Sequence, residues 1–400
     1  MITRQTQRQH RVRASMQTNE SQGGMDIVGY HRVAFILPSL KGGGAQRVVL
    51  TIANKLANSG LEVDVVLFEQ AGEYVEHVSP RINVWNLGTK RAMRSFLPLL
   101  RYSRRRKPLI AISSLPHVNL LMILVKLLGS KATKVIAVEH NTLSQTIQHS
   151  RGYSIYVLIA LMKLFYRYAT KLIAVSHGVK NDLQEVLKLK DKSVTVIYNP
   201  VITASLSSQS KKPVRHPFFE DRSSPVIVAA GRLTQAKGFT LLLDAISLVT
   251  RDTPCRLIIL GEGPDREALE EQLQRLGLES SVSLPGFVAN PYSFFSNSDL
   301  FVLSSYWEGL PTVLIEALAC GTPVVSTDCP SGPKEILENG RLGKLVPVGD
   351  VKALASEIRK AFTLGHSTPS LDSIHTRFSE ESCVRKYREL IDAEVAAIDT

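Results

Sequence analysis

The chain has 400 residues, which is long for a single hydrophobic core and indicates two domains. Its composition is 44% hydrophobic and 21% charged, which is an ordinary balance for a globular protein. Its four cysteines form no Cys-x-x-Cys pair, a spacing that excludes a disulfide framework or zinc finger and favours a reducing cytoplasm. Lysine and arginine exceed aspartate and glutamate by 12, which favours anionic binding partners. The sequence has no RNA-recognition motif and no interleaved aromatic-basic pattern, so an anionic membrane surface is a better candidate partner than nucleic acid.

The first 27 residues are expected to form a disordered basic tail. Four arginines precede the first acidic residue, Glu20, and no apolar stretch is long enough for a signal peptide. Met16 and Met25 are alternative start positions to Met1.

Residues 28–199 are expected to form a first Rossmann-like domain. Short apolar, β-branched runs alternate there with helical patterns such as 45–57 and 179–188. The runs expected to be strands are 33–38, 63–68, 82–87, 109–113, 134–138, 172–175 and 194–197. Continuously apolar strands joined by helices predict a parallel sheet that is covered on both faces.

Residues 200–378 are expected to form a second domain of the same class. A stretch rich in Ser, Lys and Pro at 202–224 is predicted to be an irregular linker, after which the alternation restarts. The strands expected are 226–230, 256–260, 282–284, 300–303, 324–326 and 344–346. We expect the last helix, 379–397, to pack back on the first domain. Ligands of doubly wound sheets bind at the carboxyl ends of the strands.

Two glycine-flanked turns could hold phosphate at those strand ends. Gly43 and Gly44 lie between the first strand and the first helix, where backbone N–H groups can approach an anion, although a plain tight turn explains them equally well. Arg232 and Lys237 bracket the turn after the strand at 226–230, so both cations can converge on one pyrophosphate.

The segment from Glu308 to Glu316 is the strongest signal in the sequence. It begins where a strand ends, and its predicted helix leaves free N–H groups that suit a phosphate. The two carboxylates can accept hydrogen bonds from hydroxyls on two parts of one ligand. The residues expected to meet that ligand are Glu308, Gly309, Leu310, Pro311, Thr312 and Glu316.

These motifs, together with Gly-Glu-Gly-Pro at 261–264 and Leu-Pro-Gly-Phe at 284–287, resemble the family 4 glycosyltransferases across residues 31–395. The resemblance implies the GT-B fold, in which two Rossmann-like domains face a central cleft. It also implies transfer with retention of anomeric configuration and no need for a metal or other cofactor.

The resemblance assigns roles to single residues. Arg232 and Lys237 would bind the donor diphosphate, which the loop at Gly43 and Gly44 would approach from the other domain. Glu308 would contact the transferred sugar and Glu316 the ribose. The residues that would meet the nucleotide base are Phe287 and Val288.

His140, at the end of the strand at 134–138, matches a histidine that the family places near the reacting sugar; an ordinary strand-end residue is the equal alternative. Residues 327–337 resemble a subgroup that builds bacterial surface polysaccharides or lipid-linked oligosaccharides from UDP-hexoses or N-acetylhexosamines. The acceptor would then be a glycan or a lipid-linked sugar.

Two other functions stay open: an inverting GT-B transferase or epimerase, and an inactive nucleotide-sugar-binding subunit. The basic run at 101–107 and the apolar helix at 153–170 predict peripheral docking on the anionic inner face of the cell membrane.

Overall fold

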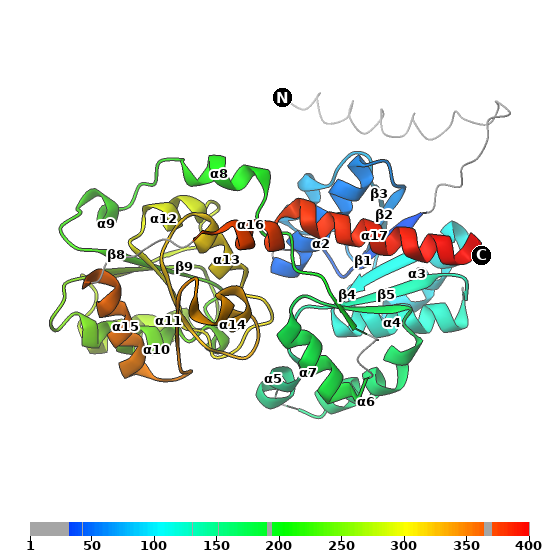
Figure 1. Ribbon diagram of the computed structural model, residues 1–400. Coiled ribbons are helices and arrows are strands. Elements are labelled where there is room, and N and C mark those ends of the chain that lie inside the picture. Colours follow the sequence, from blue (N-terminus) through cyan, green and yellow to red (C-terminus); the bar gives the residue numbers. More distant parts are fainter. Residues whose placement is uncertain are drawn as a thin grey trace, which may run out of the picture. The chain divides into compact units, whose positions relative to one another are not determined.

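The computed structural model describes residues 32–41, 43–129, 131–150, 152–189, 194–363 and 370–399. The predicted basic tail, residues 1–27, lies outside the described residues. Residues from 32 onward form two parallel sheets covered by helices (Figure 1), which confirms the α/β prediction.

The first sheet has seven strands in the order β3-β2-β1-β4-β5-β6-β7. Its interior strand β1 (Val33–Leu37) pairs in parallel with β2 on one side and β4 on the other, and all five of its residues are buried. The other strands are β2 (Val63–Leu67), β3 (Asn83–Asn86), β4 (Ile110–Ser114), β5 (Lys134–Glu139), β6 (Lys171–Ala174) and β7 (Val194–Val196).

Helices cover this sheet, and α4 (Pro116–Leu128) packs between α3 and α6. The other helical elements are α2 (Gly44–Asn58), η1 (Glu73–His77), α3 (Ala92–Arg106), α5 (Leu143–His149), α6 (Ser154–Phe165), η2 (Tyr166–Tyr168) and α7 (His177–Leu187). Within the described ranges, no helix combines the length and the apolar character that crossing a bilayer requires.

The second sheet has six parallel strands in the order β10-β9-β8-β11-β12-β13. They are β8 (Val226–Ala230), β9 (Arg256–Leu260), β10 (Val282–Gly286), β11 (Leu300–Leu303), β12 (Val324–Thr327) and β13 (Lys344–Val346). Its helical elements are η4 (Gln235–Lys237), α10 (Phe239–Val249), α11 (Arg266–Leu276), α12 (Tyr292–Asn297), α13 (Thr312–Ala319), α14 (Pro333–Ile336), η5 (Glu338–Gly340) and α15 (Val351–Thr363).

The prediction of an irregular linker at 202–224 was wrong in part. The segment contains two helices, α8 (Ala204–Ser210) and α9 (Pro217–Glu220). Serine disfavours helix interiors, so α8 has no sequence signal; it forms because Leu206 is buried and the helix packs on α12.

The chain passes between the two sheets twice, and the two passages are hydrogen-bonded to each other. The N–H groups of Val201 and Ile202 both donate to the carbonyl of Phe378 at 3.0 Å, and Glu380 N–H donates back to Ile202 at 2.9 Å. Helices α16 (Asp372–Phe378) and α17 (Glu380–Asp399) follow, and α17 packs against α2 of the first sheet (Figure 1).

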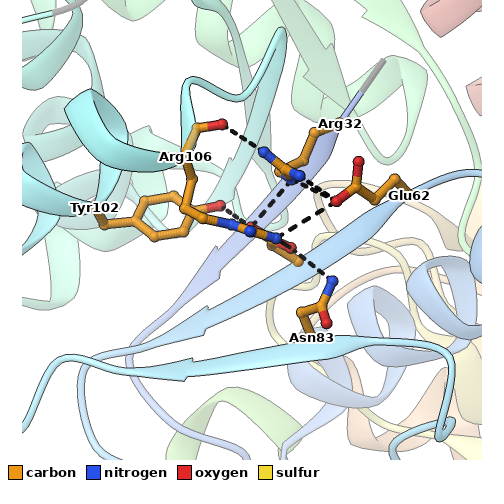
Figure 2. Close-up of polar contacts among 6 residues, drawn as sticks. Arg32, Glu62, Asn83, Tyr102 and Arg106 are labelled. Carbon is orange, nitrogen blue, oxygen red and sulfur yellow. Dashed lines mark hydrogen bonds and ion pairs between the residues drawn. The ribbon is translucent and has the colours of Figure 1, made fainter. Parts of the chain in front are cut away.

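A buried carboxylate joins α3 to the first sheet. Asp64 on β2 is inaccessible to solvent and accepts hydrogen bonds from Tyr102 Oη at 2.7 Å and from Arg106 Nε at 3.2 Å. Arg32 Nε lies 3.7 Å from the same carboxylate, and its guanidinium also pairs with Glu62. Figure 2 shows these partners converging: Arg32 and Glu62 come from the residues before β1 and β2, and Tyr102 and Arg106 come from α3. Two arginines and a tyrosine hydroxyl therefore stabilise the buried carboxylate, and Glu62 shares both arginines.

Replacing Asp64 should destabilise the first domain. Asp64→Ala leaves the Tyr102 hydroxyl without its acceptor and takes the buried carboxylate away from two partly buried guanidinium groups, which keep only Glu62 as an acidic partner among the described residues. We therefore expect the free energy of unfolding to fall by about 2–4 kcal/mol. Urea unfolding followed by circular dichroism measures this. Arg105→Ala, on the exposed side of the same helix, is the matched control and should change the value by less than about 0.5 kcal/mol. Equal effects of the two changes would contradict the role given to Asp64.

Candidate functional site

The turn after β8 carries the two predicted phosphate-binding cations. It is held against the end of β11: Tyr306 N–H donates to Ala236 at 2.8 Å and Ser304 Oγ donates to the Lys237 carbonyl at 2.9 Å. Gly238 has φ +60°, and a Cβ there would lie 2.1 Å from the Ser304 carbonyl oxygen, so the turn requires glycine. The backbone contacts of this turn thus fix the position of the Lys237 main chain, from which its side chain extends.

Lys237 and Glu308 form an ion pair at this turn. Lys237 Nζ lies 2.6 Å from Glu308 Oε1, and Ser305 Oγ donates to the same oxygen at 2.7 Å. The Arg232 guanidinium is exposed and makes no hydrogen bond or ion pair to another described residue. The structure therefore brings two of the predicted site residues into contact and leaves the third free to meet a ligand.

Gly309 joins this edge of the second sheet to the first domain. A Cβ at this position would lie 1.9 Å from the His140 carbonyl oxygen, so only glycine allows the approach. The Gly309 carbonyl accepts hydrogen bonds from Ser176 Oγ at 2.9 Å and Ser331 Oγ at 2.8 Å. Ser176 is the N-cap of α7, so residues from both domains hold the segment.

The helix that follows starts without a capping side chain. Leu310 and Pro311 lead into α13, whose first residue is Thr312, and no side chain bonds the N-terminal amides among the described residues. Such amides carry partial positive charge and suit an anion. They begin four residues beyond Glu308.

Glu316 on α13 is buried and paired with an arginine that the sequence analysis missed. Arg47 Nη2 lies 2.8 Å from Glu316 Oε1 and 2.9 Å from Tyr292 Oη. Burial raises the pKa of Glu316 above its usual value, and the nearby Arg47 charge opposes that shift. Arg47 is the fourth residue of α2, so this pair brings the loop at Gly43 and Gly44 next to α13.

The signal that could have found Arg47 was local. It is the first charged residue after the glycines of the loop, on the opening turn of the helix, where a cation is disfavoured unless an anion faces it. Its partner, Glu316, lies 269 residues away in the sequence, and no local pattern predicts that these two residues pair.

His140 follows β5 and points a nitrogen into the protein. Its Nε2 is buried and has no hydrogen-bond partner among the described residues, and burial lowers the pKa of His140 to about 4. The preceding residue, Glu139, accepts hydrogen bonds from Asn119 Nδ2 at 2.8 Å and from Tyr166 Oη, and burial raises its pKa to about 7. At neutral pH His140 is therefore an uncharged imidazole.

Phe287 and Val288 follow β10 at the same carboxyl edge of the second sheet. Phe287 is 79% exposed, while Val288 is partly buried. Gly286 before them has φ +89°, and a Cβ there would lie 2.7 Å from Glu262 Oε1. An exposed ring at a strand end suits stacking on a flat heterocycle. Within the described residues, no three His, Cys, Asp or Glu side chains gather as metal ligands would.

Two family profiles match the chain. The one described as "Glycosyltransferase Family 4" matches residues 42–205, and the one described as "Glycosyl transferases group 1" matches residues 210–373. The first corresponds to the domain of the seven-stranded sheet and the second to that of the six-stranded sheet.

Curated relatives share the sequence over different lengths. An uncharacterized glycosyltransferase of Methanocaldococcus jannaschii is 41% identical over 152 residues, 38% of this chain and 37% of the relative. The N-acetylgalactosamine-N,N'-diacetylbacillosaminyl-diphospho-undecaprenol 4-alpha-N-acetylgalactosaminyltransferase of Campylobacter jejuni is 26% identical over 81% of this chain and 88% of the relative. A lipopolysaccharide core biosynthesis glycosyltransferase of Rhizobium meliloti is 33% identical over 43% of this chain and 50% of the relative.

Solved structures share the fold over most of the chain. The Anabaena protein HepE in complex with UDP superposes with a TM-score of 0.74 at 21% identity, covering 90% of this chain and all of that one. Sucrose-phosphate synthase from Thermosynechococcus elongatus gives 0.75 at 18% identity and covers 92% of this chain. These neighbours confirm the predicted GT-B fold.

The environment of His140 predicts its titration. Because the folded chain binds the proton at a pKa of about 4 and the unfolded chain near 6.5, the imidazole should stay neutral between about pH 5.5 and 8. Its contribution to the free energy of unfolding should then fall as the pH drops from about 6.5 to 4. Histidine side-chain NMR, with His140→Gln to assign the signal, measures this. A midpoint near the ordinary value would contradict the burial described.

Proposed function

Because the chain belongs to the family 4 glycosyltransferases, we propose that it transfers a hexose or N-acetylhexosamine from a UDP-sugar to a glycan or lipid-linked acceptor in the synthesis of a bacterial surface polysaccharide. The observation that carries the proposal is the Lys237–Glu308 pair beside the free Arg232, on a segment that meets His140 through Gly309.

In this proposal the cations stabilise the leaving group. Breaking the glycosyl–phosphate bond leaves negative charge on the nucleoside diphosphate, which Arg232, Lys237 and the uncapped amides of α13 would meet. Lys237 already holds Glu308 at 2.6 Å, so a sugar hydroxyl on that carboxylate and a phosphate on the lysine would lie side by side.

The ribose would bind at Glu316, as the family resemblance implies. That carboxylate is occupied by Arg47, so ribose hydroxyls would have to share or replace the arginine's hydrogen bond. Arg47 would then be free to turn toward the diphosphate. Phe287, exposed at the end of β10, would cover the base.

Retention by a front-face route is the mechanism we propose. Apart from Glu308, which Lys237 and Ser305 already hold, the site as described contains no obvious carboxylate nucleophile. An oxygen of the leaving phosphate would take the acceptor's proton, and the neutral His140 would orient or polarise the sugar. No metal is proposed, since cations of the chain would balance the diphosphate.

The relatives support the substrate class. The Campylobacter enzyme is named for transfer of N-acetylgalactosamine to a diphospho-undecaprenol-linked sugar, and the Rhizobium relative for lipopolysaccharide core synthesis. Since the chain spans only 37% to 50% of two of the relatives above, the choice of acceptor rests on the Campylobacter protein, which it matches along most of its length.

The proposal is tested by a screen of UDP- and GDP-sugars for slow hydrolysis or transfer in EDTA. We expect one UDP-sugar to react with EDTA present and to give a product with the donor's anomeric configuration, read by proton NMR. Inversion would favour the inverting alternative, and activity restored only by a divalent ion would contradict the metal-free site. No reaction and no binding with any donor would contradict both the retaining and the inverting transferase.

The two cations should matter more than other surface charges. Arg232→Ala or Lys237→Ala removes charge from the leaving group, so kcat/KM for the donor should fall about 100-fold or more. Arg275→Ala, an exposed arginine at the end of α11, is the matched control and should behave as wild type. Wild-type turnover in both site variants, with unchanged unfolding temperature, would refute the phosphate assignment.

A further inference from the structure

Positive charge is concentrated in one continuous part of the chain. Residues 77–181 contain 17 lysines and arginines and a single acidic residue, Glu139. The rest of the chain holds 31 basic and 35 acidic residues. Glu139 is buried and hydrogen-bonded by Tyr166, so it adds no negative charge to the surface. The whole net charge of the protein therefore belongs to this part of the first domain.

The same part of the chain exposes apolar side chains. Of the 12 large hydrophobic residues that stand exposed in the described part of the protein, nine lie on three helical segments. They are Met93 and Leu97 on α3, Leu128 at the end of α4, and Tyr153, Tyr156, Val157, Leu161, Leu164 and Tyr168 along α6 and η2. Met93 is 86% exposed and Tyr153 is 89% exposed.

These segments are neighbours in space. Helix α4 packs against α3 on one side and α6 on the other, so the three form one layer over the first sheet. The buried side of α6 carries Ile155, Ile159 and Met162. Its exposed residues recur every three or four positions on the opposite side, which gives the helix a second apolar face. No described segment covers that face.

The exposed arginines of the same helical layer are free of acidic partners within the described residues. They are Arg91, the residue before α3, and Arg94, Arg101, Arg104 and Arg105 within it, and none forms an ion pair within the described residues. Arg91 and Arg94, with Gly88, Thr89 and Lys90, also line a hollow of about 480 Å³. Arg106 differs, because Asp64 holds it inside the protein. We call α3, the end of α4, α6 and η2 the basic apolar face.

We propose that the basic apolar face docks on an anionic phospholipid bilayer. Arginines at its rim would bind lipid phosphates, the aliphatic side chains would enter the boundary of the acyl chains, and the three tyrosines would lie at the headgroup level. Nucleic acid would use the cations but has no place for Met93, Leu97 or Leu161. A second copy of this chain would bring two strongly basic faces together.

Docking explains how a cytoplasmic chain could reach a lipid-linked acceptor, but it does not rest on the proposed function, since vesicle binding needs no substrate. Surface charge and exposed apolar side chains contribute together, so binding should fall when salt is added and when either set is removed.

The test is flotation of the full chain with vesicles of phosphatidylcholine alone or mixed with phosphatidylglycerol. We expect binding to the mixed vesicles only. The charge variant R101Q/R104Q/R105Q and the apolar variant V157Q/L161Q/L164Q should each lower the bound-to-free ratio at least about tenfold. The control R275Q/K344Q/K352Q removes the same charge from exposed positions of the second domain and should bind as wild type.

Three outcomes would overturn the inference: no binding to anionic vesicles, equal losses in the control and the charge variant, or duplex DNA binding that persists in salt that releases the vesicles. The substituted side chains are exposed, so unfolding temperatures should not change. Donor hydrolysis without vesicles separates the two proposals. Hydrolysis without vesicle binding would contradict only the docking proposal, and vesicle binding without hydrolysis would contradict only the proposed enzyme activity.

Discussion

The close approach of Gly309 to the His140 carbonyl is the contact on which the candidate site depends. It exists because residue 309 has no side chain, and the hydroxyls of Ser176 and Ser331 fix the glycine's own carbonyl in place. Glu308 lies immediately before this contact and α13 begins three residues after it. The position of a carboxylate, a helix N-terminus and a strand-end histidine is thus set by one backbone contact.

Each acidic residue of the site has its own cation in the structure. Lys237 neutralises Glu308, and Arg47 neutralises the buried Glu316. An unpaired buried carboxylate would carry a large desolvation cost, so these pairs make the site stable without a ligand. In the function proposed above, a ligand would therefore bind by exchange: an anion would compete for the cations, while hydroxyl groups would replace them on the carboxylates.

Much of the fold follows from sequence pattern alone. The apolar runs such as 33–38 and 226–230 predict buried parallel strands because a strand covered on both faces must be continuously hydrophobic. The helix α8 could not be predicted, because its serines carry no periodicity and only its packing on α12 stabilises it. The sequence marks Lys237 and Glu308 as candidate site residues, but their pairing depends on how two turns 71 residues apart meet. Arg47 was missed for the same reason, at a far greater separation.

The last helix has a consequence for how the protein is made. Helix α17 lies on α2, and Lys55 pairs with Glu380 at 3.0 Å, so the first domain includes residues from the far end of the chain. During synthesis on the ribosome, α2 must wait for more than 300 further residues before its covering helix emerges. The domain translated first is therefore completed last, and the surface of α2 that α17 covers stays exposed until then.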